Sequence, residues 1–382
     1  MTGLVAADRG HRTERGRTLT TTDSGPDLGS VADELSTLDR FLPVWIGLAM
    51  AGGLLLGRLI PDLNDGLERI KVDTVSLPIA LGLLAMMYPV LAKVRYSHLG
   101  DELADRRTLV LSLVLNWLVG PLLMFTLAWV FLADLPELRT GLIIVGLARC
   151  IAMVLIWNDL ACGSRELAAV LVAINSLFQI VMYSVLGWFY LSVLPEWLGL
   201  DTADLDVSIW AIAKSVLIFL GLPLLAGFLT RTIGEARKGR AWYEETFLPR
   251  IGPVALYGLL FTIVVLFALQ GEQITESPLD VARVAIPLLV YFALMWGGAF
   301  LTGRRLGLSY ERNTSVAFTA AGNNFELAIA VAIAVFGVTS GQALAGTIGP
   351  LIEVPALVGL VYVSLWAKGR YYTTNATVTP TS

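Results

Sequence analysis

The segment Gly146-Leu-Ala-Arg-Cys-Ile-Ala-Met-Val-Leu-Ile-Trp-Asn-Asp159 decides the fold class, because it places a charge and a thiol inside a long apolar run. The run extends over residues 140–160, and a helix needs ~20 mostly apolar residues to cross a bilayer. A charged side chain at membrane depth costs several kcal/mol, with about 2.5–3.5 as a low value. Such residues persist mainly where they pair, line a cavity or move ions, so Arg149 and Cys150 are candidate site residues.

A second apolar run carries a similar polar cluster, Thr319-Ala-Ala-Gly-Asn-Asn-Phe-Glu-Leu-Ala328. Two asparagines after a glycine indicate an interrupted membrane helix, whose free backbone groups line a site. We therefore expect a break around Asn323 and Asn324, with a counterpart over residues 146–149. Glu326 follows the asparagines near the middle of its run.

Composition places the whole chain in a membrane. Of its 382 residues, 56% are hydrophobic and only 15% are charged, whereas soluble domains carry roughly 25% charged residues. The net charge of −4 gives no basic field for nucleic acid. Two cysteines without CxxC spacing provide no disulfide framework, and two histidines outside the apolar runs exclude motifs such as HExxH.

Apolar runs of spanning length recur along the chain. They predict an all-α integral membrane protein with ten transmembrane helices, at 42–61, 77–94, 108–133, 140–160, 166–194, 208–230, 250–270, 281–303, 312–336 and 341–366. Internal prolines do not exclude them, since neighbouring helices can satisfy the freed backbone groups.

The two halves of the chain resemble each other. The string that begins at Pro78 is similar to the one at Pro253, and the same offset carries Cys150 to Phe325, beside Glu326. Since each half has five spans, a repeat must be inverted, which is a recurrent transporter architecture. We expect a polar, disordered tail over 1–40, repeats over 41–200 and 205–370, and a short C-terminal tail over 371–382.

Lysine and arginine set the expected orientation. With ten spans, about 20 of these residues lie on the side of the termini and about 5 on the other, which places both termini in the cytoplasm. The expected location is the cell membrane.

Two residues have side chains suited to transport chemistry. A carboxylate surrounded by lipid and protein favours its neutral form, so Glu326 can take up and release protons; the structural alternative is a buried ion pair with Arg149. Cys150 is either a small inert core residue or a reactive thiol favoured by the neighbouring cation. We expect no functional role for Cys162. Four further polar residues lie inside the apolar runs: Asn116, Asn175, Gln179 and Glu353. We interpret them mainly as groups that join helices through hydrogen bonds. Glu353 is the one among them for which a functional role is most to be suspected.

The strings 148–158 and 323–330 closely resemble the signature motifs of the arsenical-resistance-three permeases, and the similarity extends over roughly 40–370. That family belongs to the bile acid, arsenite and riboflavin transporter superfamily. The resemblance implies ten spans in an inverted repeat, with the fourth and ninth helices broken and crossing at the site. It implies arsenite efflux against proton entry, with the essential cysteine at Cys150 and the essential glutamate at Glu326.

The chemistry of the candidate site agrees with this resemblance. Arsenite is a small neutral hydroxide, and soft thiolates select soft centres. We expect Cys150 to bind As(III) as substrate, with Glu326, Asn323 and Asn324 taking its hydroxyls or the proton. Arg149 and Asn158 complete the expected site. Antimonite is a further possible cargo, and we expect no cofactor.

Two other functions fit parts of the sequence. A sodium-coupled organic-anion transporter of the same superfamily could use the oxygens of Asn158, Asn323, Asn324 and Glu326 as cation ligands, but Cys150 would then have no role. An intramembrane enzyme would need a nucleophile with a base or paired aspartates, and the apolar runs contain no histidine. We therefore do not expect an enzyme.

Overall fold

The computed structural model describes residues 41–60, 71–72, 75–94, 105–200, 208–276 and 278–372. The tails expected over 1–40 and beyond residue 372 lie outside this part of the chain. Within it the fold is helical apart from β1 (Lys71–Val72) and β2 (Val75–Ser76), which pair antiparallel. The expected all-α class is therefore confirmed in its coarse form.

Helical segments occupy every range expected to span. From the N-terminal half they are α3 (Leu42–Leu59), α5 (Leu77–Ala92), α7 (Arg106–Val114), α8 (Gly120–Phe131), α9 (Pro136–Leu147), α10 (Met153–Leu160), α11 (Arg165–Trp188) and α12 (Leu194–Trp197). From the C-terminal half they are α13 (Ile209–Val216), α14 (Leu222–Lys238), α15 (Arg240–Trp242), α16 (Leu248–Glu276), α17 (Pro278–Arg305), α18 (Tyr310–Ala321), α19 (Phe325–Phe336) and α20 (Gly341–Tyr371).

Six continuous helices among the described residues are long and apolar enough to cross a membrane. They are Arg106–Phe131, Arg165–Trp197, Ile209–Lys238, Arg240–Gly271, Pro278–Arg305 and Gly341–Tyr371. The helices α3 and α5 are shorter, and two further expected spans are each divided into two half-helices.

Wider π-helical turns join several of these helices, and each precedes a proline. They are η2 (Leu115–Val119), η3 (Phe189–Val193), η4 (Leu217–Gly221) and η5 (Tyr243–Phe247), followed two residues later by Pro121, Pro195, Pro223 and Pro249. Proline has no N–H and its ring clashes with a carbonyl one turn earlier. The wider turn accommodates this defect inside a continuous helix.

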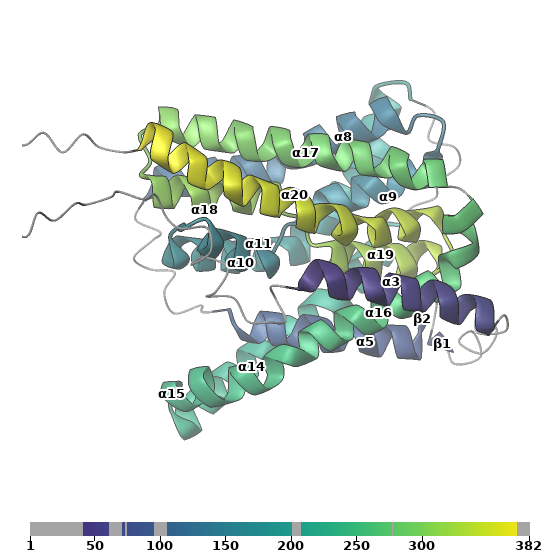
Figure 1. Cartoon of the computed structure of the whole chain (residues 1–382), viewed down its shortest axis with the longest axis horizontal. Helices are drawn as coiled ribbons and strands as arrows, with labels where there is room; N and C mark the ends of the chain where they lie inside the picture. The colour runs from purple at the N-terminus through teal and green to yellow at the C-terminus, as the bar shows by residue number, and fades with distance from the viewer. Residues whose placement is uncertain are drawn as a thin grey trace, which may run out of the picture.

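The helices pack in two groups that both draw on the two halves of the sequence. In one group α16 packs on α3 and α5, and α14 packs on α5; in the other, α20 packs on α9, α17 and α19, while α17 packs on α18 and α8 on α9. Figure 1 shows α14 and α15 projecting at the lower left of the bundle. Contacts of α19 with α5 and of α20 with α3 and α16 join the two groups.

The two divided helices run in opposite directions. In Figure 1, α9 and α19 lie on the right of the bundle, and α10 and α18 lie on the left. The chain therefore runs from right to left in this view through α9 and α10, and from left to right through α18 and α19. Contacts between α9 and α19 and between α10 and α18 agree with this arrangement.

Candidate functional site at the helix crossing

Both divided helices are interrupted at the centre of the bundle. The first leaves helical geometry between Leu147 and Met153, and the second between Ala321 and Phe325. The break expected after Gly322 is confirmed. The first break lies slightly later than the expected 146–149, because Gly146 remains helical and serves packing: a side chain there would collide with Met124.

The two interruptions bind each other through their backbones. Arg149 and Asn323 form an antiparallel bridge. The Cys150 N–H donates to the Gly322 carbonyl over 3.3 Å, and the Asn324 N–H donates to the Ala148 carbonyl over 3.0 Å. Backbone groups buried away from water must be paired, so each interruption satisfies the other. The antiparallel bridge thus sets Cys150 opposite Gly322 and Ala148 opposite Asn324.

Two side chains hold the outer edges of this pair. Gln179 of α11 accepts a hydrogen bond from the Arg149 N–H and donates one to the Arg149 carbonyl, both at 2.9 Å. Glu353 of α20 accepts a hydrogen bond from the Asn323 N–H at 3.2 Å. The sequence favours a helix-packing role for both residues and marks Glu353 as the more unusual, but nothing local to either residue indicates its partner in another helix.

Cys150 lies at the middle of the crossing and does not face lipid. It is 2% exposed, and its Sγ lies 3.4 Å from the position that a Cβ on Gly322 would take. Its thiol interacts electrostatically with Glu353 and Glu326. A soft sulfur ligand and two acids therefore lie within electrostatic range of one another.

Arg149 is fully buried and holds its guanidinium away from the acids. Its Nη1 donates to the Tyr291 hydroxyl at 2.8 Å, and its Nη2 donates to the Gly146 carbonyl. Gly120 leaves room for it, because a Cβ there would lie 2.5 Å from Nη1. The ion pair between Arg149 and Glu326, considered as the structural alternative, is absent from the part of the chain that the structure describes. Tyr291 carries no signal in the sequence that could have revealed this role.

The three asparagines are buried and keep unused polar atoms. Asn323 Nδ2 donates to the carbonyls of Val145 and Ala148, while Asn324 caps α19 by accepting from the Leu327 N–H at 3.0 Å. Asn323 Oδ1 and Asn324 Nδ2 have no hydrogen-bond partner among the described residues. Buried polar atoms without partners are rare in proteins, so both asparagines remain candidate site residues.

Asn158 lies away from the crossing. It sits near the end of α10, where its Oδ1 accepts from Ser315 Oγ at 2.8 Å and its carbonyl accepts from the Gly163 N–H. Its Nδ2 is buried without a partner among the described residues. The structure therefore brings together Arg149, Cys150, Asn323, Asn324 and the half-buried Glu326, but groups Asn158 with Ser315 instead.

Helix ends give the crossing a defined electrostatic character. The half-helices α10 and α19 both begin there, at Met153 and Phe325, and α9 and α18 both end there. Helix N-termini carry partial positive charge and C-termini partial negative charge. Glu326 lies in the first turn of α19, where the helix dipole favours a carboxylate. Paired half-helix ends of this kind bind substrates and coupling ions in transporters.

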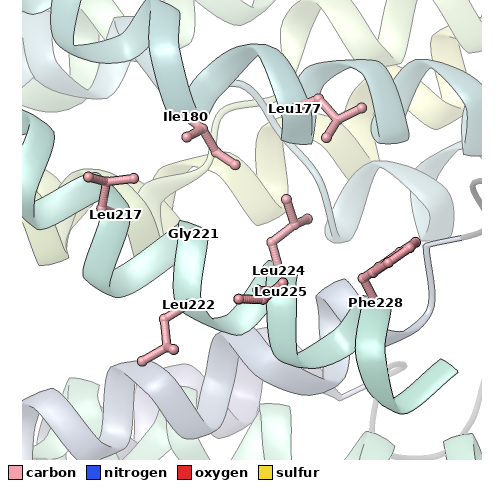
Figure 2. A pocket seen from close by; sticks show the side chains of 8 residues that line it. All are labelled: Leu177, Ile180, Leu217, Gly221, Leu222, Leu224, Leu225 and Phe228. Atoms are coloured by element: carbon pink, nitrogen blue, oxygen red, sulfur yellow. The ribbon is translucent and has the colours of Figure 1, made fainter. Parts of the chain in front are cut away.

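Two hollows in the described part of the chain lie away from the crossing. One is an apolar groove of about 630 Å³. Figure 2 shows its lining, which comes from α11, η4 and α14: Leu177, Ile180, Leu217, Gly221, Leu222, Leu224, Leu225 and Phe228. A polar hollow of about 490 Å³ is lined by residues at the end of α10 and the start of α11, including Cys162. At the crossing itself Arg149, Cys150 and Asn323 are buried.

Known proteins resemble this chain over most of its length. The model of the sodium bile acid symporter family matches residues 80–277. The chain is 59% identical over 344 residues to the arsenical-resistance protein Acr3 of Corynebacterium glutamicum, covering 90% of this chain and 93% of that protein. The chain belongs to the Acr3 family of arsenical-resistance proteins.

Two more distant relatives also match most of the chain. The Acr3 protein of Alkaliphilus metalliredigens is 30% identical, with 85% of this chain and 92% of that protein covered. An uncharacterized transporter of Synechocystis sp. is 36% identical, with 86% and 88% covered. The family resemblance found in the two motifs is therefore confirmed, as is the multi-pass membrane architecture in its coarse form.

Proposed function

We propose that this chain exports arsenite from the cytoplasm in exchange for protons, and that the crossing is its binding site. The observation that carries the proposal is the burial of the Cys150 thiol between two interrupted helices, within electrostatic range of Glu326 and Glu353. The two relatives named as arsenical-resistance proteins support an arsenical cargo.

Cys150 captures As(III) by a reversible exchange. The thiol sulfur replaces one hydroxyl of As(OH)3, so an S–As bond forms, an As–O bond breaks, and the thiol proton leaves with the hydroxyl as water. No oxidant is needed. A single thiolate allows release, which transport requires as much as binding. Glu326 holds the proton that is exchanged, and Asn323 and Asn324 offer their free polar atoms to the remaining hydroxyls.

The same geometry supports a ten-span topology with an inverted repeat. Together with α3, α5 and the two divided helices, the six continuous spans would make up the ten. The antiparallel bridge and its two matching side-chain contacts support repeats over 41–200 and 205–370. The distribution of Lys and Arg supports cytoplasmic termini and residence in the cell membrane.

The test is arsenite uptake into everted membrane vesicles, with and without a proton gradient and in the absence of sodium. The native chain should accumulate arsenite only when the gradient is present. Cys150→Ser should abolish uptake while the protein remains folded, and Glu326→Gln should abolish the response to the gradient. Cys162→Ser is the matched control, because Cys162 lies outside the crossing.

Full uptake by Cys150→Ser would exclude Cys150 as the residue that binds As(III). Uptake that requires sodium instead of protons would favour the sodium-coupled organic-anion transporter. In that mechanism the oxygens of Asn158, Asn323, Asn324 and Glu326 would hold the cation, yet Asn158 lies with Ser315. Antimonite, a trivalent hydroxide of similar softness, is the natural second cargo to assay.

A further inference from the structure

The two interruptions are held at matching positions by chemically different side chains. Gln179 binds the backbone of Arg149, thirty residues before it, and Glu353 binds the backbone of Asn323, also thirty residues before it. Arg149 and Asn323 are themselves bridged. The amide and the acid therefore occupy equivalent places in the two halves of the site.

Gln179 shows what a complete contact at this place looks like. Its Oε1 accepts from the Arg149 N–H and its Nε2 donates to the Arg149 carbonyl, each at 2.9 Å. Both polar groups of one extended residue are satisfied by one side chain. An amide can do this at any pH, because it always carries one acceptor and two donors.

Glu353 can copy this contact only when it carries a proton. An ionised carboxylate only accepts, whereas a protonated one also donates through its O–H. Its Oε1 already accepts from the Asn323 N–H at 3.2 Å, so a proton on the other oxygen would be available for donation to the Asn323 carbonyl, as Gln179 Nε2 donates to the Arg149 carbonyl. When ionised, Glu353 would present negative charge to that carbonyl instead.

We propose that Glu353 is a positioning residue that latches the second interrupted helix when protonated and releases it when ionised. The first interruption, held by Gln179, stays fixed at any pH. The second then becomes the moving half of the site, and its movement is tied to a proton. The proposal rests on the proposed proton exchange and supplies the step that links a proton to the helix that carries Glu326.

The surroundings of Glu353 favour such a switch. It is 4% exposed, and the titratable groups that act on it or feel its charge are Glu326 of α19 and the Cys150 thiol. From α3, α9, α10, α16 and α17, which also pack on α20, the described residues supply no cation to it. Two like charges at close range disfavour simultaneous ionisation, so proton loss from Glu326 favours proton retention on Glu353.

The decisive variant is Glu353→Gln, which reproduces Gln179 and fixes the latch. Arsenite exchange at equal concentrations and equal pH on both sides of proteoliposomes moves no net protons. In the native protein its rate should depend on pH by up to about tenfold per unit, as for one controlling proton. In Glu353→Gln the latch stays closed at every pH, so the exchange should be slower and its remaining rate should not change with pH.

Gln179→Glu is the matched control, since it places the same acid in the equivalent site. It should add pH dependence to the exchange rate where Glu353→Gln removes it. A merely structural Glu353 would leave the pH profile of Glu353→Gln unchanged, because glutamine keeps the contact with Asn323. That result would overturn the proposal.

Thermal unfolding in detergent tests the latch even if arsenite is not carried. Because the protonated form makes the extra contact, the native protein should gain stability relative to Glu353→Gln as the pH falls. A difference between the two melting temperatures that does not change with pH would overturn the latch. Failure of arsenite exchange in the native protein, with this pH trend present, would instead count against the proposed cargo.

Discussion

Gly322 and Cys150 touch across the helix crossing. The Cys150 N–H donates to the Gly322 carbonyl over 3.3 Å, and a Cβ built on Gly322 would lie 2.9 Å from the Cβ of Cys150. The backbone of Gly322 has φ −70° and ψ 146°, which any residue can adopt. Glycine is therefore needed here for space, so that the second interruption can approach the thiol.

Gly322→Ala should push the two interruptions apart and displace the Cys150 thiol. Overpacking of this kind costs about 1–3 kcal/mol of stability, and arsenite export should fall by about tenfold or more, since a misplacement of 1 Å costs ~100-fold in comparable sites. Gly298→Ala on α17 is the control, because a Cβ there meets no atom within 4 Å. Equal export by both variants would contradict the close contact as a requirement of the site.

Tyr291→Phe should destabilise the protein through Arg149. The Tyr291 hydroxyl accepts from the buried guanidinium at 2.8 Å, and a hydrogen bond to a charged group contributes about 1.5–3 kcal/mol. The melting temperature in detergent should fall accordingly. Tyr257→Phe, at a ring that is 62% exposed, should change it little. No difference between the two variants would mean that Arg149 is held by other contacts.

The two cysteines should differ in their reaction with maleimides. Cys162 is half-buried and lines the polar hollow at the end of α10, whereas Cys150 is buried. Thiol reactivity follows exposure as well as ionisation. In single-cysteine variants Cys162 should react at least about tenfold faster, and arsenite should protect Cys150 alone. Faster labelling of Cys150 would show that the crossing is open to solvent in the resting protein.

The Asp105 carboxylate, at the start of α7, should make the free energy of unfolding depend on pH. Hydrogen bonds from the Thr108 hydroxyl and N–H, and the Arg312 guanidinium at 2.9 Å, hold the pKa of the Asp105 carboxyl below its ordinary value of 3.8. A lowered pKa adds stability that is present above the ordinary value and is lost as the pH falls through the lowered one.

Asp105→Asn keeps the helix cap but removes this charge. Asparagine caps as well as aspartate, so the variant should lose stability near neutral pH and should converge with the native protein in acid. Melting temperatures from neutral pH down to about 3 would measure this. A constant difference over that range would exclude the ionised carboxylate as the source.

The sequence alone predicts the membrane class, the helix ranges and the second break. A long apolar run is stable in a bilayer regardless of which helices pack beside it. Glycine and asparagine have low helix propensity, so the segment Gly322-Asn-Asn324 favours a break. These are local properties of the chain. The first break is displaced toward Met153 because Gly146 packs against Met124, which is a contact between distant helices and leaves no trace in the local pattern.

Only the tertiary structure decides which partners the site residues take. Arg149 pairs with Tyr291, which is 142 residues away, rather than with Glu326, and Asn158 joins Ser315 rather than the crossing. The holding roles of Gln179 and Glu353 emerge in the same way. Helix periodicity sets which residues share a face, but the rotation and pairing of whole helices depend on packing summed over the bundle. The sequence therefore determines the chemistry of each residue, and the tertiary structure determines which partner that residue contacts.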